Sequence, residues 1–211
     1  MDGLINKAIE NFVLSIADEE TWGRIKGQAG VPHMCFIQTE QYPDSITYDL
    51  VMAASEVLGL EPADVLSGFG RFWSKYSETL GYNSLLGLSY ENFDQFMLNL
   101  DDLHSRIALS FPGSQPPSFK VTCNEENGTL NVRYKSHRPG LSPFVEGVFE
   151  GLAERFDVSI RIDHEQVDPE DDVQRYMITH QASPATTDPA RGRCPFSGTE
   201  GFEGLPQPGE D

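Results

Sequence analysis

The sequence predicts an α+β domain in which a helical first half is followed by a small antiparallel sheet with helices. Through most of the first 110 residues, apolar side chains recur at helical spacing. Residues 118–136 and 158–181 instead alternate apolar and polar side chains, as strands do. Helices in one part of a chain and strands in another are typical of the α+β class. The length of 211 residues suits one domain with a single core.

Two amphipathic helices are predicted in the first 58 residues. The first covers residues 4–22, and its apolar face carries Leu4, Ile5, Ala8, Phe12 and Ile16. The second covers residues 49–58 and ends at Gly59, because glycine is the residue most often found just past a helix end.

A third helix begins near Pro62, since proline is favoured in the first turn of a helix. Its apolar side chains recur at Val65, Phe69, Trp73 and Tyr76. Gly68 and Gly70 lie inside this helix, where glycine is unfavourable. We therefore expect another segment to pack closely against it.

A fourth helix, predicted over residues 92–110, carries a lone histidine, His104. The apolar stripe that includes it consists of Phe93, Phe96, Met97, Leu100, His104 and Ile107. The polar side chains fall largely off this stripe: Asn92, Asp94, Asp101 and Arg106. A histidine on a buried face is more often a core residue than a metal ligand. No second His or Cys follows at a spacing of three or four residues, which argues against zinc.

The second half begins with a predicted hairpin. Residues 118–124 and 129–136 form its strands, and the turn lies at 126–128. A helix over residues 141–156 follows, and two more strands at 158–167 and 174–181 complete the sheet.

The second strand of the hairpin leads into three polar side chains on one face, Tyr134, Ser136 and Arg138. Two hydroxyls and a guanidinium are suitable donors for a pair of carboxylates in a pocket, although a water-facing strand gives the same pattern. Together with a single imidazole on an apolar wall, these donors suit haem. Haem needs one protein ligand, an apolar slot and partners for two propionates.

Three motifs, LDDLHSRIALSFP at 100–112, QPPSF at 115–119 and YKSHR at 134–138, resemble the H-NOX (haem-nitric oxide/oxygen binding) family. This family includes the sensor domain of soluble guanylate cyclase and stand-alone bacterial gas sensors. The similarity covers about residues 1–180. It implies haem b (iron protoporphyrin IX) with His104 as the proximal iron ligand and with Tyr134, Ser136 and Arg138 holding the propionates.

The resemblance also implies which residues surround the haem. Pro117 and Ile5 would press on the porphyrin, and Leu100 would contact it. The pocket above the iron would be formed by Ile5, Ile9, Trp73, Phe144 and Gly147. Without the resemblance, Trp73 and Phe144 are core aromatics and Pro117 is a loop residue before a strand.

Pro143 occupies the position where oxygen-binding members of the family have a tyrosine, five residues after Arg138. Bound oxygen carries partial negative charge and is stabilised by a buried hydrogen-bond donor, which proline lacks. This favours a nitric oxide sensor, whose gas ligands would be nitric oxide and carbon monoxide. The resemblance implies that nitric oxide breaks the bond between iron and His104. The change would then be signalled to a separate protein, namely a histidine kinase, a cyclic-di-GMP enzyme or a chemotaxis receptor.

Three alternatives remain, and the second and third belong to other functional classes. The first is a haem protein that senses oxygen or redox state. The second is a haem enzyme, which would need a distal acid–base residue. The other histidines do not fall at a recognised distal position, so we do not expect an enzyme: His33, His137, His164 and His180. The third is an acidic adaptor without a cofactor, in which His104 is a core residue.

Charge and composition restrict the partners and the location. A net charge of −18 argues against nucleic acid and against anionic membranes as partners. No signal peptide or membrane-spanning stretch is evident, and three cysteines without paired spacing do not indicate a disulfide framework. We therefore expect a cytoplasmic protein. Residues 1–181 would form the domain, and 182–211, rich in Pro, Gly, Ser and Thr, a disordered tail. Within this tail, Cys194-Pro195 resembles a haem-regulatory motif but is more simply an exposed thiol.

Overall fold

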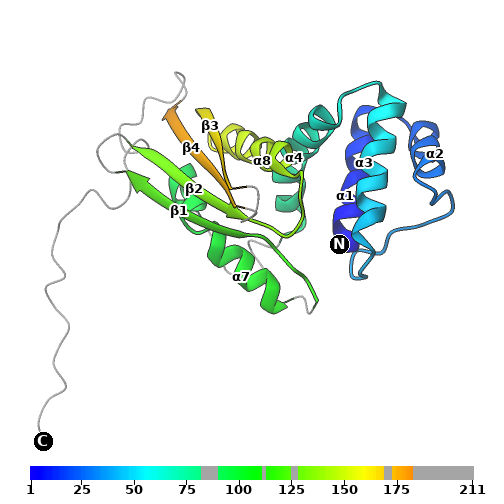
Figure 1. Ribbon diagram of the computed structural model, residues 1–211, viewed down its shortest axis with the longest axis horizontal. Helices are drawn as coiled ribbons and strands as arrows, with labels where there is room; N and C mark the ends of the chain where they lie inside the picture. The colour runs from blue at the N-terminus through cyan, green and yellow to red at the C-terminus, as the bar shows by residue number, and fades with distance from the viewer. Residues whose placement is uncertain (82–89, 111–112, 125–127, 169–172, 183–211) are drawn as a thin grey trace, which may run out of the picture.

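The computed structural model describes residues 1–81, 90–110, 113–124, 128–168 and 173–182. Helices α1, α2 and α3 lie together at one end of the molecule and a four-stranded sheet lies toward the other (Figure 1). Helices α4 and α8 lie between these two parts. The predicted α+β class is confirmed.

Four helices build the N-terminal part: α1 (Gly3–Ile16), α2 (Glu19–Gln28), α3 (Asp44–Leu58) and α4 (Pro62–Thr79). The single helix predicted over 4–22 is therefore wrong, because it is split into α1 and α2. The split occurs where the Asp18 carboxylate accepts a hydrogen bond from the Thr21 backbone N–H at 2.8 Å and begins α2. As a result Ile16 lies at the end of α1 and is 54% exposed.

Helices α3 and α4 largely follow the prediction. Helix α3 begins at Asp44 rather than at residue 49, and Gly59 ends it in the left-handed conformation with φ 68°. Helix α4 has Pro62 in its first turn, as predicted. The core of this part is made of Ala8, Ile9, Phe12, Val13, Trp22, Ile25, Phe36, Leu50, Val51, Ala53, Ala54, Val65 and Phe69.

The helix predicted over 92–110 is interrupted, and forms α6 (Phe93–Leu98) and α7 (Leu100–Ser110). Asn99 lies outside both helices, and its side chain donates a hydrogen bond to the Gln95 carbonyl at 2.8 Å. The apolar stripe nevertheless stays buried from Phe93 to Leu100. Asp94, expected off this stripe, is only 4% exposed, and its Oδ1 lies 2.7 Å from Nε2 of His180 on β4.

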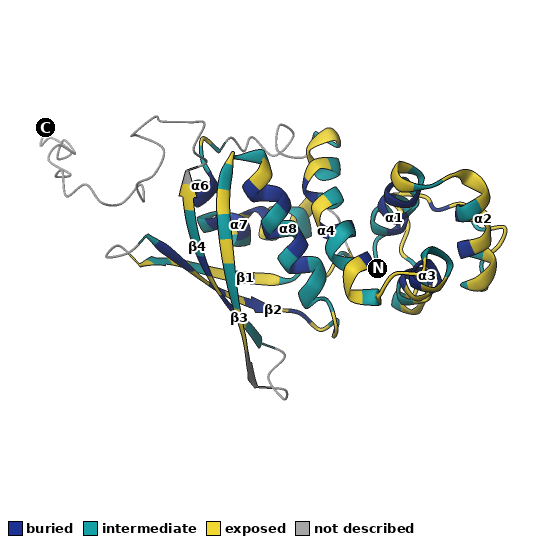
Figure 2. Ribbon diagram, turned by 90° about the horizontal axis from the view of Figure 1, so that it is seen from above, coloured by how far each residue is buried: buried dark blue, intermediate teal, exposed yellow. Residues whose placement is uncertain are grey.

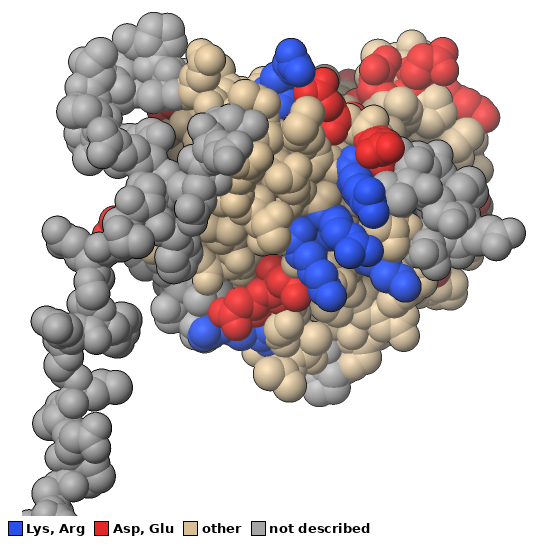
Figure 3. Space-filling model, turned by 60° about the vertical axis from the view of Figure 1, so that its left-hand side comes forward, with Lys and Arg blue, Asp and Glu red and all other residues tan. Residues whose placement is uncertain are grey.

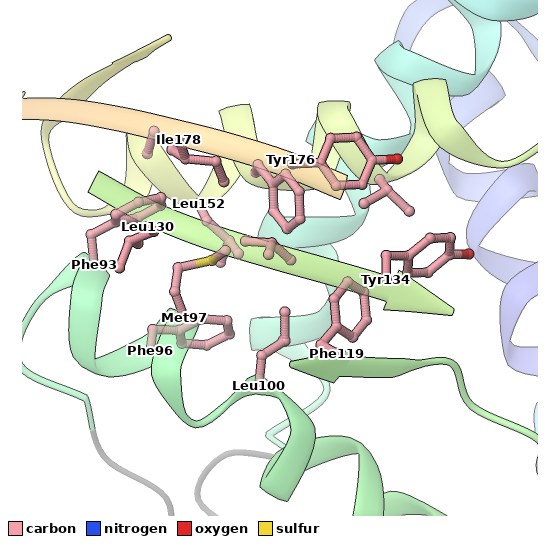
Figure 4. Packing of buried hydrophobic residues seen from close by; sticks show 14 of the residues in the cluster. Phe93, Phe96, Met97, Leu100, Phe119, Leu130, Tyr134, Leu152, Tyr176 and Ile178 are labelled. Atoms are coloured by element: carbon pink, nitrogen blue, oxygen red, sulfur yellow. The ribbon is translucent and has the colours of Figure 1, made fainter. Parts of the chain in front are cut away.

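The strands are β1 (Ser118–Asn124), β2 (Thr129–Lys135), β3 (Val158–Asp168) and β4 (Val173–Ala182). Their order is β1-β2-β4-β3 and all neighbours are antiparallel. The predicted hairpin is β1–β2, although most of its predicted turn lies outside the described residues. Figure 2 shows α6, α7 and α8 (Ser142–Arg155) on one side of the sheet. Between them and the sheet lies a second core (Figure 4).

Helices α4 and α8 cross with their backbones in contact. A Cβ atom on Gly147 would lie 2.1 Å from the Ser67 carbonyl oxygen, and one on Gly70 would lie 2.2 Å from that of Phe144. The close approach expected at Gly70 is therefore confirmed, and α8 is the element responsible. Phe144 packs against both cores, so the two parts are joined at this crossing.

None of the helices in the described ranges is long and apolar enough to span a membrane. Cys35 is an exposed free thiol, whereas Cys123 on β1 is disulfide-bonded. The prediction was that the cysteines form no disulfide framework, and the bond at Cys123 is one that the spacing of the cysteines did not reveal. The predicted tail, with Cys194-Pro195, lies outside the described residues from residue 183 onward.

Candidate functional site

Strand β2 and the segment after it bring three predicted site residues together. Tyr134 is 4% exposed and Ser136 is 8% exposed, on the inward side of the sheet. The Ser136 Oγ accepts a hydrogen bond from the Arg138 backbone N–H at 3.1 Å. The predicted alternation is observed for Tyr134, Lys135 and Ser136, of which only Lys135 is exposed. Because β2 ends at Lys135, hydrogen bonds rather than strand geometry position Ser136 and Arg138.

The Arg138 guanidinium joins this segment to the helical part of the molecule. Its Nε donates to Asp44 Oδ2 at 2.8 Å, its Nη2 to Asp44 Oδ1 at 3.4 Å, and its Nη1 to the Gln115 carbonyl at 2.8 Å. The same carboxylate accepts a hydrogen bond from the N-terminal ammonium of Met1 at 2.5 Å. Burial alone would raise the pKa of Asp44, but the hydrogen bonds from Met1 and Arg138 outweigh burial and lower it.

His104 has one ring nitrogen engaged in a hydrogen bond and one that keeps its lone pair. Its Nδ1 lies 2.7 Å from the Leu100 carbonyl oxygen, one helical turn earlier in α7. Because a carbonyl oxygen can only accept, Nδ1 carries the proton and the lone pair lies on Nε2. Burial lowers the pKa of His104 and so favours the neutral imidazole, which is the form that binds metals.

One aromatic ring connects His104 to the donors at the end of β2. The Phe119 ring centroid is 5.1 Å from that of His104 and also 5.1 Å from that of Tyr134. Figure 4 shows Phe119 and Tyr134 side by side at the ends of β1 and β2. Helix α7 is held to β1 by Asp101, whose Oδ1 accepts hydrogen bonds from the Phe119 N–H at 2.8 Å and the Ser118 hydroxyl at 3.2 Å.

Three apolar site residues come from different elements. Pro117 is half-buried directly before β1. Leu100 is buried in the core between the sheet and its helices. Ile5, on α1, packs against the core of the helical part. The predicted haem contacts are thus divided between the two parts of the molecule.

Of the remaining predicted pocket residues, Ile9 is buried on α1 in the core of the helical part, and the others lie at the crossing of α4 and α8. The Phe144 ring centroid is 5.2 Å from that of Phe69, and the Trp73 ring is 6.5 Å from the same Phe69 ring. Pro143 is half-buried in the first turn of α8 and has no N–H to donate. Gly147 is covered by the backbone of α4.

A family model described as haem-NO-binding (HNOB) matches residues 2–164. The chain belongs to this family. Solved H-NOX structures share its fold. One from S. oneidensis, in the Fe(II)NO ligation state, is 20% identical with a TM-score of 0.76, covering 86% of this chain and 99% of that chain. An Fe(II) unliganded H-NOX protein from K. algicida is 20% identical with a TM-score of 0.73, covering 87% of this chain and 98% of that chain.

Curated relatives of this H-NOX chain are soluble guanylate cyclases. The protein gcy-32 of Caenorhabditis elegans is 33% identical over 77% of this chain and 24% of its own length. Another from the same animal, gcy-31, is 29% identical over 73% of this chain and 22% of its own length. The chain thus spans about a quarter of the length of these relatives. The H-NOX domain is a haem-based gas sensor related to the sensor domain of these cyclases.

Two residues that organise this H-NOX site were missed by sequence reasoning, Asp44 and Asp101. Asp44 lies in the first turn of α3, where an acidic residue is common at the surface, and its partner Arg138 is 94 residues away. Asp101 lies off the apolar stripe, which is the pattern of a solvent-facing residue. Neither position carried a local signal for its distant partner.

Proposed function

We propose that this protein is a haem-based nitric oxide sensor in which haem b is held by His104. The observation that supports the proposal best is the state of the imidazole. The proton on Nδ1 is held by the Leu100 carbonyl, and the half-buried, neutral ring keeps its lone pair on Nε2. Membership of the haem-NO-binding family supports the same assignment.

The donor set fits the cofactor. Tyr134, Ser136 and Arg138 provide two hydroxyls and a guanidinium within one short segment, and these would hold the two propionates. Pro117, Ile5 and Leu100 would supply apolar contacts with the ring. When bound, haem supplies an iron centre that can take nitric oxide or carbon monoxide.

Gas preference follows from the residues at the start of α8. Pro143 has no hydrogen-bond donor, and its neighbours in the proposed pocket, Ile5, Phe144 and Gly147, are apolar. Such a pocket gives no stabilisation to the partial charge of bound oxygen, whereas nitric oxide needs little. Among the side chains of the proposed pocket, only Trp73 carries a hydrogen-bond donor, its indole N–H. This donor is the basis of the alternative that the protein senses oxygen.

His104 and α7 would transmit the signal. If the imidazole were no longer held as a ligand, α7 would still be held to β1 by the hydrogen bonds of Asp101, the contact of His104 with Phe119 and the packing of Leu100 and Leu103. Helix α7 then has two positions biased by a single ligand bond, which is a two-state switch. We propose that a separate cytoplasmic partner reads the change, and that it is a histidine kinase, a cyclic-di-GMP enzyme or a chemotaxis receptor.

The test is the visible spectrum of the purified, haem-loaded protein and of two variants. The Soret band of the wild-type protein should shift with nitric oxide and with carbon monoxide. The wild-type protein should form no stable oxygen complex in air. His104→Gly should lose most of its haem or require added imidazole, because it lacks an axial nitrogen. His137→Gly is the control. His137 is exposed and lies between Ser136 and Arg138, and this variant should behave like the wild type. A His104→Gly variant with the wild-type spectrum and no imidazole would overturn the proposal.

A further inference from the structure

The outer face of the sheet carries a cluster of cations. Lys120 on β1 lies directly opposite Arg133 on β2, and Arg133 lies directly opposite Arg175 on β4. Lys135 follows Arg133 on the same face, two residues along β2. All four are exposed, and we call them the cationic patch. Figure 3 shows Lys and Arg side chains gathered at the centre of this face.

This arrangement is unfavourable for the isolated domain. Neighbouring strands are about 4.8 Å apart, and like charges on directly opposite residues destabilise a sheet. An ion pair is a lysine or arginine nitrogen within 4.0 Å of a carboxylate oxygen. Among the described residues, no carboxylate oxygen comes this close to a nitrogen of any patch side chain. Most other described lysines and arginines do lie in ion pairs: Lys7, Arg71, Lys75, Arg106, Arg138, Arg155 and Arg161.

The surroundings of the patch define the chemistry of its partner. Met177, which is 42% exposed, follows Arg175 on the outer face of β4 and provides an apolar contact. On β3 the same face turns acidic, with Asp163 and Glu165 opposite Met177 and Arg175. A complementary surface would therefore present carboxylates toward β1, β2 and β4, with an apolar group near the centre.

The patch also lies next to the proposed switch. Lys120 directly follows Phe119, whose ring contacts His104 and whose N–H is bonded to Asp101 on α7. On a strand these neighbours point to opposite faces. A shift of α7 that moves the inner face of β1 would thus be felt on the outer face through Lys120.

We propose that the cationic patch is the docking surface for an acidic surface of the signalling partner, an inference that rests on the proposed function. A net charge of −18 would repel a nucleic acid or an anionic membrane over a wide area, and four cations are too few to offset this. For a protein partner the local charges dominate, because physiological salt screens charges beyond about 8 Å.

The probe is fluorescein-labelled poly-L-glutamate, titrated with the haem-loaded protein at low and at physiological salt. Arg133→Gln/Arg175→Gln should bind it about tenfold more weakly than the wild type. The matched control, Arg24→Gln/Lys26→Gln on α2, removes the same charge elsewhere and should change binding less than about twofold. The patch variant should also unfold at a temperature about 1–3 °C higher, because it relieves like-charge repulsion.

Equal weakening in the patch variant and in the control would overturn the proposal. It would also be overturned by patch-dependent binding of single-stranded DNA or of phosphatidylserine vesicles when poly-L-glutamate does not bind. A salt-sensitive dimer abolished in the patch variant would assign the surface to a second copy of the chain instead. Failure of the proposed function is read separately, as a wild-type Soret band that does not respond to nitric oxide.

Discussion

Replacing Arg138 by Ala should destabilise the haem-free protein by about 1–2 kcal/mol. The side chain is 13% exposed and makes two hydrogen bonds of 2.8 Å, one to Asp44 and one to the Gln115 carbonyl. A charged hydrogen bond contributes about 1.5–3 kcal/mol when buried, but exposed ion pairs contribute about 0–1 kcal/mol. We take an intermediate value because Asp44 is 40% exposed and keeps the Met1 ammonium as a partner. The melting temperature should fall by about 2–8 °C.

A double-mutant cycle with Asp44→Asn isolates the interaction, and its coupling energy should be about 1 kcal/mol. Lys75→Ala is the matched control, because Lys75 pairs with Glu154 at 2.7 Å but is 64% exposed. The pKa of Asp44 is lowered in the folded state, so its contribution is present above pH 3.8 and is lost as pH falls through the folded pKa. If Arg138→Ala loses no more stability than Lys75→Ala, Arg138 does not join the two parts of the molecule.

The same variant tests the proposed propionate site. Haem should transfer to apomyoglobin faster from Arg138→Ala than from Ser136→Ala, because a charged donor contributes about twice as much as a neutral one. The gas preference should not change, since Arg138 is proposed to lie at the edge of the haem. Equal transfer rates would remove Arg138 from the propionate site and leave the stability result intact.

Other predictions follow from single positions. Gly147→Ala should destabilise the protein by about 1–3 kcal/mol in chemical denaturation, because the new Cβ meets the Ser67 carbonyl. Gly23→Ala on α2 is the control; its new Cβ has open space around it, and it should stabilise the protein by about 0.5–1 kcal/mol. Pro143→Tyr should create a stable oxygen complex in the visible spectrum and Pro143→Phe should not, since only the tyrosine carries a donor. Burial lowers the pKa of His104, so the unfolded state binds more protons; the stability of the haem-free protein should therefore decline as pH drops below 6.5, and less steeply in His104→Gln.

Sequence patterns located elements better than they located breaks between elements. The strands at 118–124 and 158–168 were predicted within about a residue, because alternation of side chains is a local property. The break at Asn99 was missed because the apolar stripe continues across it. At Asp18 a signal was present, since an aspartate before two glutamates is a typical helix start.

The candidate site shows the same division between local and distant information. Tyr134 and Ser136 are both buried, as their two-residue spacing predicts, and His104 occupies a helical stripe that is visible in the sequence. The partner of Arg138 was not predictable, because the approach of α3 to the segment after β2 depends on how the two parts of the fold meet. Periodicity within one element contains no information about that approach.

Two contacts that the sequence did not reveal give His104 its place in the proposed switch. Phe119 lies between the imidazole and Tyr134, and Asp101 holds the backbone of the same Phe119. Helix α7, which carries the proposed ligand His104, and strand β2, which carries Tyr134, are therefore not independent, since both contact Phe119 on β1. A movement of α7 must stretch the Asp101 hydrogen bond, move Phe119, or both. The rearrangement proposed to follow release of His104 would for this reason reach the sheet first, and the sheet carries the cationic patch on its other face.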